Sequence, residues 1–292
     1  MGSIARPPRA SVAAGVAADG VICSSSGMTT ESLDSLVGPS DPPPVEIFNR
    51  DGRTAALLIC DHASAAIPRA LGDLGLDAGQ RRLHIAWDIG AADVTRRLAA
   101  RLDVAAILSG YSRLVIDCNR QLDDPTSIPQ ESDGIGVPGN RGLTKAMRQQ
   151  RAESCFWPYQ RAVEAWIEAT RAAGIAPIVV SMHSFTPVMN GFERPWHIGI
   201  LANRDRRIAQ PLLEALRREA TLCVGDNEPY DGRQGRGYGM MVHGEETGMP
   251  FALIEMRQDL IDTHHGAEAW ADRLAPILGR IFADRGLRRS TP

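Results

Sequence analysis

From about residue 55 onward, the hydrophobic and polar positions of this chain alternate between short apolar runs and longer amphipathic segments. The apolar runs predict buried strands over 55–60, 104–109, 113–117, 176–182, 197–201, a short stretch near Leu222, and 251–255. The amphipathic segments predict helices over 80–86, 90–102, 144–174, 206–219, 238–247 and 265–284. Threonine is a good helix N-cap, which favours a helix beginning at Thr144.

Strands that are apolar throughout and alternate with helices are typical of a sheet buried on both faces. We therefore predict an α/β fold, a three-layer α/β/α sandwich around a mostly parallel (mixed) central sheet. In such sheets the ligand site lies beyond the carboxyl ends of the strands. A long polar loop, 118–142, follows the predicted strand 113–117, and a connection of this length is usually functional or disordered.

The first 45 residues differ from the rest, because they are rich in Ser, Gly, Pro and Ala and have no sustained hydrophobic period. Such a segment buries little apolar surface, so we predict a flexible arm over 1–45 and a single catalytic domain over 46–292. The arm lacks the continuous apolar core of a secretory signal. The sequence leaves open whether translation starts at Met1 or Met28.

Composition and charge narrow the class of protein. Of the 292 residues, 43% are hydrophobic and 23% are charged, and the formal net charge is −3. Nucleic-acid-binding proteins usually have a strong basic excess, and no apolar run approaches the ~20 residues that span a bilayer. We therefore expect neither nucleic acid nor membrane as a partner. The five cysteines are scattered, which is typical of a reducing compartment and predicts a cytoplasmic protein.

Three apolar runs end on a residue that can bind a metal ion or transfer a proton. The first run is followed by Asp61 and His62, the run 176–182 by His183, and the last run by Glu255. A single histidine after a strand is more often a loop residue or a buried imidazole with a hydrogen-bond partner. Two histidines and a glutamate at strand ends instead indicate a functional cluster.

Two histidines and a carboxylate are ordinary ligands of a catalytic zinc ion, which keeps one position open for water. We assign His62 and His183 as ligands and Asp88, in the segment AWDIGA, as the third. Asp88 is equally well placed to cap the following helix, and the spacing also allows Asp88 and Glu255 to exchange roles. Glu255 is the expected general base. The expected cofactor is a divalent metal ion, with Zn²⁺ as the first choice.

Several polar residues near the predicted strand ends suit an acidic ligand. The segment SRLVIDCNR contains Arg113, Asn119 and Arg120, and an arginine can bind a carboxylate through paired hydrogen bonds. Asp117 is placed to orient one of these arginines. Seen singly they are solvated loop charges, but beside a metal site they predict a small acidic substrate. Arg257 is expected to support this binding.

His243 is a further candidate, because it follows a glycine-rich turn in the segment GYGMMVHGEETG. It is expected to contact the substrate or stabilise an oxyanion, which would place it with Glu255 and Arg120 among the catalytic residues. A structural role for His243 is equally compatible with the sequence.

Eight motifs occur in a fixed order along the chain: CDHAS, AWDIGA, SRLVIDCNR, GVPGNRG, SMHSFTP, RPWHIGIL, GDNEPYDGR and IEMRQDLI. Together they resemble the N-formylglutamate amidohydrolase (N-formylglutamate deformylase) family over roughly residues 50–285. The resemblance implies a fold similar to that of zinc carboxypeptidases. It also implies hydrolysis of N-formyl-L-glutamate to glutamate and formate, a late step of histidine catabolism.

The resemblance carries functional residues onto matching positions: His62, Asp88, His183 and Glu255, with Asn119 and Arg120 as the pair that holds the substrate carboxylate. One departure concerns the metal ligands. Zinc carboxypeptidases take two ligands from an H-x-x-E run, but the residue three positions after His62 is Ala65. The third ligand must therefore come from elsewhere in the chain.

Two other functions stay open at this point. A carboxypeptidase-like enzyme or an N-acyl amino acid amidase would keep the metal and cleave a different bond. A non-catalytic sensor of an acidic metabolite would keep the pocket without needing a general base. The exact acyl-amino acid, the identity of the metal and the oligomeric state are also open.

Overall fold

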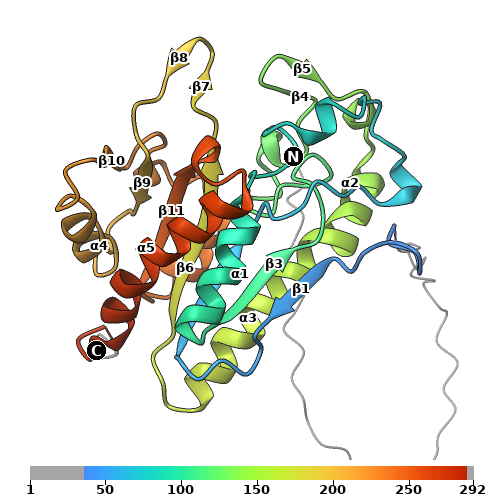
Figure 1. Ribbon diagram of the computed structural model, residues 1–292. Helices are drawn as coiled ribbons and strands as arrows, with labels where there is room; N and C mark the ends of the chain where they lie inside the picture. Colours follow the sequence, from blue (N-terminus) through green and yellow to red (C-terminus); the bar gives the residue numbers. More distant parts are fainter. Residues whose placement is uncertain (1–35, 288–292) are drawn as a thin grey trace, which may run out of the picture.

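The computed structural model of the protein describes residues 36–287, which form a three-layer α/β/α sandwich (Figure 1). The strands of its central sheet are β1 (Val45–Phe48), β2 (Ala56–Cys60), β3 (Ala105–Ser109), β6 (Ile178–Phe185), β9 (Ile198–Leu201), β10 (Val224–Asp226) and β11 (Phe251–Arg257). They lie in the order β1-β3-β2-β6-β11-β9-β10. The central strands β3, β2, β6 and β11 are parallel, whereas β1 and the pair β9–β10 run antiparallel to them. The predicted α/β fold with a mixed, mostly parallel sheet is confirmed.

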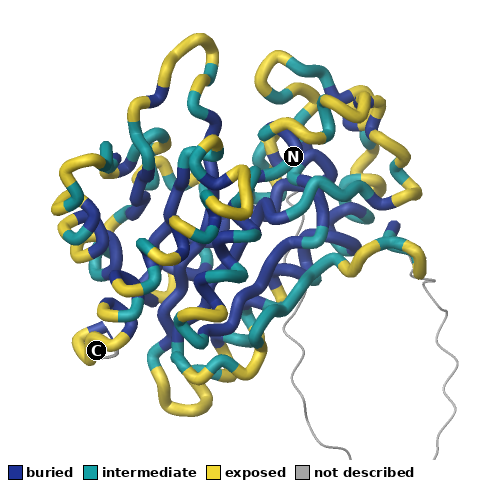
Figure 2. The backbone as a smooth tube through the Cα atoms, viewed as in Figure 1, coloured by how far each residue is buried: buried dark blue, intermediate teal, exposed yellow. Residues whose placement is uncertain are grey.

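Helices cover both faces of the sheet. They are α1 (Ala91–Leu102), α4 (Ala209–Leu216) and α5 (His264–Ala283) on one face, and α2 (Lys145–Arg151), a π-helix (Ala152–Phe156) and α3 (Trp157–Ala172) on the other. Side chains alternate along each strand, so Leu58 and Val180 face the α1 layer while Leu57 and Val179 face the α3 layer. Both sets are buried, which explains why the strands are apolar throughout (Figure 2).

Most predicted elements are confirmed with small shifts of their ends. The predicted helix 144–174 corresponds to α2, the π-helix and α3, and Thr144 Oγ1 accepts a hydrogen bond from the Met147 backbone N–H at 3.2 Å. The predicted helix 238–247 is a π-helix over Gly239–Glu245. The segment 80–86 contains only a 3₁₀ turn at Gln80–Arg82, so the helix expected there is wrong.

The predicted strand 113–117 is also wrong. This segment is largely buried but does not pair with the sheet. The carbonyl oxygens of Leu114 and Val115 accept hydrogen bonds from the side chains of Asn140 and Arg151 instead. The apolar pattern RLVID therefore indicates that the segment is buried. It does not distinguish a buried loop from a strand, because both bury apolar side chains.

The sequence patterns missed the edge strand β1 and two short hairpins. These hairpins are β4 (Glu131–Ser132) with β5 (Ile135–Gly136), and β7 (Val188–Met189) with β8 (Phe192–Glu193). They project on the same side of the molecule (Figure 1), and their turns are exposed (Figure 2). Strands of two residues have too few positions to show an alternating pattern.

Residues 36–44, at the end of the predicted arm, lie against the domain. Leu36 is buried and its backbone N–H donates to Ser154 Oγ at 3.1 Å, while the Pro42 carbonyl accepts a hydrogen bond from Tyr111. Residues 1–35 of the predicted arm lie outside the described residues. Among residues 36–287, no helix is long and apolar enough to cross a membrane.

Candidate active site

The regular strands position two of the site's side chains. His183 and Glu255 lie inside β6 and β11 rather than after them, and they are direct neighbours in the parallel pairing of these strands. Because side chains alternate along a strand, both point to the same face of the sheet as Val179 and Leu253. His62 follows β2 by two residues. The sheet ladder therefore fixes the spacing of His183 and Glu255 through backbone hydrogen bonds.

Asp88 reaches the histidines from the turn that precedes α1. Its backbone N–H donates to the His62 carbonyl at 3.0 Å, and the N-cap residue of α1 is Gly90, which has a φ of 80°. A Cβ at Gly90 would collide with the carbonyl oxygen of Ile261, so this close approach requires glycine. Asp88 therefore does not cap the helix, and its carboxylate turns toward the two imidazoles.

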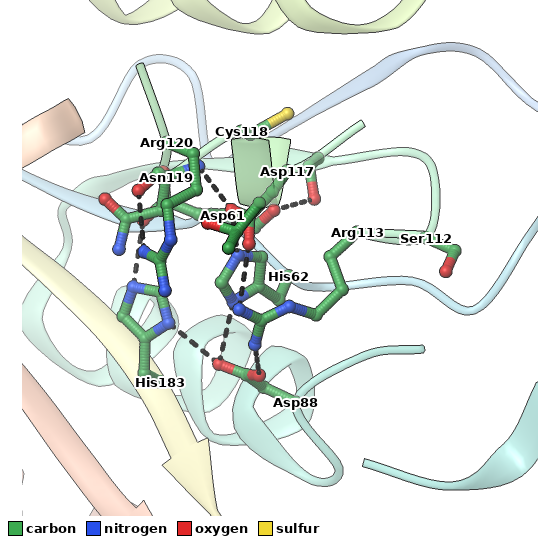
Figure 3. Close-up of polar contacts among 12 residues, drawn as sticks. Asp61, His62, Asp88, Ser112, Arg113, Asp117, Cys118, Asn119, Arg120 and His183 are labelled. Carbon is green, nitrogen blue, oxygen red and sulfur yellow. Dashed lines mark hydrogen bonds and ion pairs between the residues drawn. The ribbon is translucent and has the colours of Figure 1, made fainter. Parts of the chain in front are cut away.

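His62, Asp88 and His183 converge on one point (Figure 3). Asp88 Oδ2 lies 3.2 Å from His62 Nδ1 and 2.7 Å from His183 Nδ1. One potential ligand atom from each residue lies within 4.8 Å of the others, and all three residues are at most 3% exposed. Two imidazole nitrogens and a carboxylate oxygen form a donor set that suits zinc. This cluster could hold a metal ion.

Each imidazole is held by a further carboxylate at its other nitrogen. Asp117 Oδ1 lies 2.7 Å from His62 Nε2, and Asp61 Oδ2 lies 2.9 Å from His183 Nε2. Metal-binding histidines commonly use their second nitrogen in this way, because it fixes the ring and the tautomer. Both Nδ1 atoms are thereby left to face Asp88. The sequence indicated Asp117 only as a partner for an arginine, and Asp61 only as the neighbour of His62.

These two carboxylates are themselves fixed by hydrogen bonds. Asp61 accepts one from Tyr159 at 3.0 Å and one from the Ser181 hydroxyl at 2.7 Å. Asp117 Oδ2 accepts one from Arg113 Nη2 at 2.8 Å, which confirms the expected pairing with an arginine. The orientations of both histidine rings are therefore fixed by carboxylates that are themselves held in place.

The cluster favours positive charge at its centre. Burial lowers the pKa of His183, but its hydrogen bonds with Asp61 and Asp88 outweigh this effect and raise that pKa well above the ordinary value. Burial would raise the pKa of Asp88, but the two imidazoles hold it far below the ordinary range. A divalent cation between the rings would supply the same positive charge as the protons. The residues present therefore fit a metal ion.

Glu255 is buried beside this cluster. Its Oε2 atom has no hydrogen-bond partner among the described residues, and the residue lines the cavity described below. Burial raises the pKa of Glu255 to about 7, although the nearby His183 opposes this shift. A carboxyl group with such a pKa can accept and release a proton near neutral pH.

The site opens into a cavity of roughly 530 Å³. Four arginines line it: Arg113, Arg120, Arg233 and Arg236. Arg113 is paired with Asp117 and Arg233 with Asp231. Neither Arg120 nor Arg236 forms an ion pair with a carboxylate of residues 36–287. These two guanidinium groups are thus available to an acidic ligand.

The predicted site residues fall into two groups. Those that line the cavity are His62, Asp88, Arg113, Asn119, Arg120, His183 and Glu255. His243 and Arg257 are not among its lining residues. His243 Nε2 lies 3.0 Å from Gln160 Oε1, and Arg257 is paired with Asp259 at 2.8 Å. The structure therefore does not bring these two to the predicted positions beside the substrate.

The loop 226–237 lines the cavity as well, and its residues Tyr230 and Arg236 are not among those predicted from sequence. Gly199 pairs with Glu255 across β9 and β11, and a Cβ at Gly199 would collide with the carbonyl oxygen of Glu228. The absence of a side chain lets this loop pack on the sheet beside Glu255. The motif GDNEPYDGR marks the loop in the sequence, but its spacing alone does not indicate a chemical role.

Comparisons with known proteins find a matching family and solved structures with a similar fold. The model of the N-formylglutamate amidohydrolase family matches residues 54–262. The gene product Atu2144 from Agrobacterium tumefaciens is similar in structure, with a TM-score of 0.82 and 35% sequence identity, over 85% of this chain and 98% of that one. An N-formylglutamate amidohydrolase from Ralstonia eutropha JMP134 has a similar fold, with a TM-score of 0.60 and 18% identity, over 82% of this chain and 97% of that one. No match was found among curated proteins.

Proposed function

Because the chain belongs to the N-formylglutamate amidohydrolase family, we propose that it is a metal-dependent hydrolase of a linear amide in an N-acyl acidic amino acid. The substrate we assign is N-formyl-L-glutamate or a close relative, and the products from N-formyl-L-glutamate are formate and glutamate. The matched region contains the His–Asp–His cluster and Glu255.

The observation that carries this proposal is the position of Glu255. It is a buried carboxyl group with an unpartnered oxygen, and its strand neighbour His183 belongs to a cluster that suits a metal ion. A protein that only senses a metabolite has no need for a proton-transferring group at this place, so the arrangement favours an enzyme.

The proposed reaction assigns a separate role to each group. His62, Asp88 and His183 hold the ion, which when bound polarises the scissile carbonyl and lowers the pKa of water. Glu255 accepts a proton from the attacking water and delivers it to the leaving nitrogen. A C–O bond forms and the C–N bond breaks, so the acyl group leaves as a carboxylate and the amino acid as a free amine.

Arginines on the cavity wall support an acidic substrate. Arg120 and Arg236 have no carboxylate partner among the described residues, and N-formylglutamate has two carboxylates to pair with them. Asn119 lies beside Arg120 and lines the same cavity. Arg113 forms ion pairs with Asp88 and Asp117, so we place it between the metal ligands and the bound substrate. The expected preference for formyl over larger acyl groups reflects a cost of ~1–3 kcal/mol for overfilling a packed site.

The test combines metal analysis with product release. Purified protein should contain about one divalent ion per chain and should release formate and glutamate in equal amounts from N-formylglutamate. Removal of the ion with a chelator should abolish turnover, and zinc should restore it. Turnover at the full rate by the metal-free protein would exclude the proposal.

A substrate panel separates the alternatives. Faster turnover of N-acetylglutamate, or of a dipeptide with a C-terminal glutamate, would assign the protein to the amidases or the carboxypeptidase-like enzymes. Binding of N-formylglutamate with metal present and no turnover would assign it to the sensors.

A further inference from the structure

The segment 113–120 carries four residues that line the cavity or hold its metal cluster, yet it belongs to no strand of the sheet. These residues are Arg113, Asp117, Asn119 and Arg120. Buried backbone carbonyls need hydrogen-bond donors, and here the sheet ladder does not supply them. The position of this segment therefore depends on other contacts.

Three buried side chains donate to carbonyl oxygens of this segment. The hydrogen bonds run from Asn140 Nδ2 to Leu114 at 2.9 Å, from Arg151 Nη1 to Val115 at 3.0 Å, and from Gln160 Nε2 to Cys118 at 2.7 Å. The three donor residues are at most 2% exposed. We call Asn140, Arg151 and Gln160 the carbonyl clamp.

Burying Arg151 costs free energy, because its charged guanidinium group loses its contact with water. Its other hydrogen bonds go to Asn140 Oδ1 at 2.6 Å and the Gly139 carbonyl at 3.0 Å, and no carboxylate of residues 36–287 pairs with it. Burial lowers the pKa of Arg151 to about 10. A buried guanidinium without a counter-ion is a poor source of stability. The presence of Arg151 here is better explained by the backbone carbonyl groups to which it donates hydrogen bonds.

Gln160 also connects the clamp to a second segment of the chain, the π-helix Gly239–Glu245. Its Oε1 lies 3.0 Å from His243 Nε2, in the π-helix Gly239–Glu245. This helix directly follows Tyr238, whose backbone N–H donates to the Asn119 carbonyl at 3.3 Å. His243 thus acts on the segment 113–120 through Gln160, without contacting the cavity itself.

We propose that the carbonyl clamp is a positioning device that aligns the segment 113–120 for metal and substrate binding. Asn140 and Arg151 hold the carbonyls between Arg113 and Asp117, and Asp117 orients His62. Gln160 holds the carbonyl that directly precedes Asn119 and Arg120. Asn140 and Arg151 therefore serve metal binding, whereas Gln160 serves substrate binding.

This division predicts different defects for different variants. Arg151→Met and Asn140→Ala should weaken zinc binding about tenfold or more, as expected when the partner of a metal-binding histidine is misplaced. Gln160→Met should leave zinc affinity within about threefold of the wild type and raise KM about tenfold, with a smaller change in kcat. Arg151→Lys keeps one donor and should recover part of the zinc affinity.

The experiment measures zinc affinity by competition with a chromophoric chelator, KM and kcat for N-formylglutamate at saturating zinc, and the melting temperature of each variant. The matched control is Leu278→Ala, which removes a fully buried side chain from α5 in the other helix layer. It should lower the melting temperature and leave zinc affinity and KM unchanged. The inference is overturned if the clamp variants keep wild-type zinc affinity and KM, or if Leu278→Ala reproduces their defects at equal loss of stability.

The KM measurement rests on the proposed function, whereas the zinc measurement does not. If the protein binds zinc but hydrolyses no N-acyl amino acid, the proposed function fails and the zinc affinities of Arg151→Met and Asn140→Ala still decide the inference. Should Arg151→Met not fold, Arg151→Lys and Asn140→Ala decide it in the same way.

Discussion

The two sides of the cavity are built in different ways. On one side, His183 and Glu255 lie on adjacent strands whose spacing is set by the backbone ladder. On the other, the segment 113–120 is held by the side chains of the carbonyl clamp. Metal ligands and proton-transferring groups need precise placement on rigid elements, whereas loops commonly carry residues that select the ligand. We call the side with His183 and Glu255 the strand-built side and the side with the segment 113–120 the loop-built side. The comparison teaches that the sheet sets the spacing of His183 and Glu255 by backbone pairing, whereas the position of the segment 113–120 depends largely on side-chain contacts.

The largest expected effect comes from breaking the strand-built side at its metal cluster. His183→Ala removes a proposed ligand and should lower the turnover rate by ~10³-fold or more, together with the metal content after gel filtration. The matched control is His84→Ala, because His84 lines the same cavity but is paired with Asp133. Elemental analysis should find the metal retained in this control, and equal metal content in both variants would contradict the assignment.

Glu255→Gln tests the second strand-built group. It should reduce kcat by ~10²–10⁴-fold and leave the metal bound, because the amide cannot accept the proton from water. Formate release and metal content should be measured on the same sample. Glu246→Gln, at an exposed position, serves as the control and should be fully active. An unchanged rate in Glu255→Gln would show that the base lies elsewhere.

Arg120, on the loop-built side, and Arg236, on the neighbouring loop 226–237, should affect substrate binding more than kcat. Arg120→Ala and Arg236→Ala should each lower kcat/KM for N-formylglutamate by ~10–100-fold, mainly through KM, since a hydrogen bond with a charged group contributes about 1.5–3 kcal/mol. At least one of them should lose much less with N-formylalanine, which has a single carboxylate. Arg233→Ala is the matched control, because its guanidinium is already paired with Asp231. Equal losses on both substrates for every variant would contradict a two-carboxylate site.

The smallest expected effect is on folding stability, which should depend on pH through the buried carboxyl group of Glu255. In the metal-free protein the pKa of Glu255 is about 7, above its ordinary value of 4.5, because burial disfavours the carboxylate. The free energy of unfolding should therefore fall as the pH rises through about 7, and Glu255→Gln should relieve this loss. We expect the variant to exceed wild type by on the order of 2 kcal/mol at pH 8 and to match it near pH 4.5. Urea unfolding of chelated samples measures this difference, and a pH-independent difference would contradict it.

The strand-built side could be predicted well from sequence, because apolar runs mark buried strands and parallel strands bring their carboxyl ends together. His62, His183 and Glu255 all follow from that pattern. The link between Asp61 and His183 joins residues 122 positions apart, so no local pattern reveals it. Asp61 could only have been suspected as the neighbour of His62 after the first strand.

The loop-built side was predicted only in part. Arginines and an asparagine near an apolar run indicate an acidic ligand. The run 113–117 has the same apolar pattern as a buried strand, although the structure shows a buried loop. His243 was singled out, yet its place depends on Gln160, which lies 83 positions away. Side-chain contacts of this range decide the geometry of a loop, whereas hydrophobic periodicity reports only which residues avoid water.

The register of β6 against β11 restricts how related chains can change in length. His183 stands directly opposite Glu255, so an insertion or deletion of one residue within either strand would send one of these side chains to the other face. Gains and losses of residues should therefore accumulate outside the paired strands of the sheet, above all in the β7–β8 hairpin between β6 and β9, which projects from the body (Figure 1). Homologues that vary there can change what enters the cavity and still preserve the two groups that act on it.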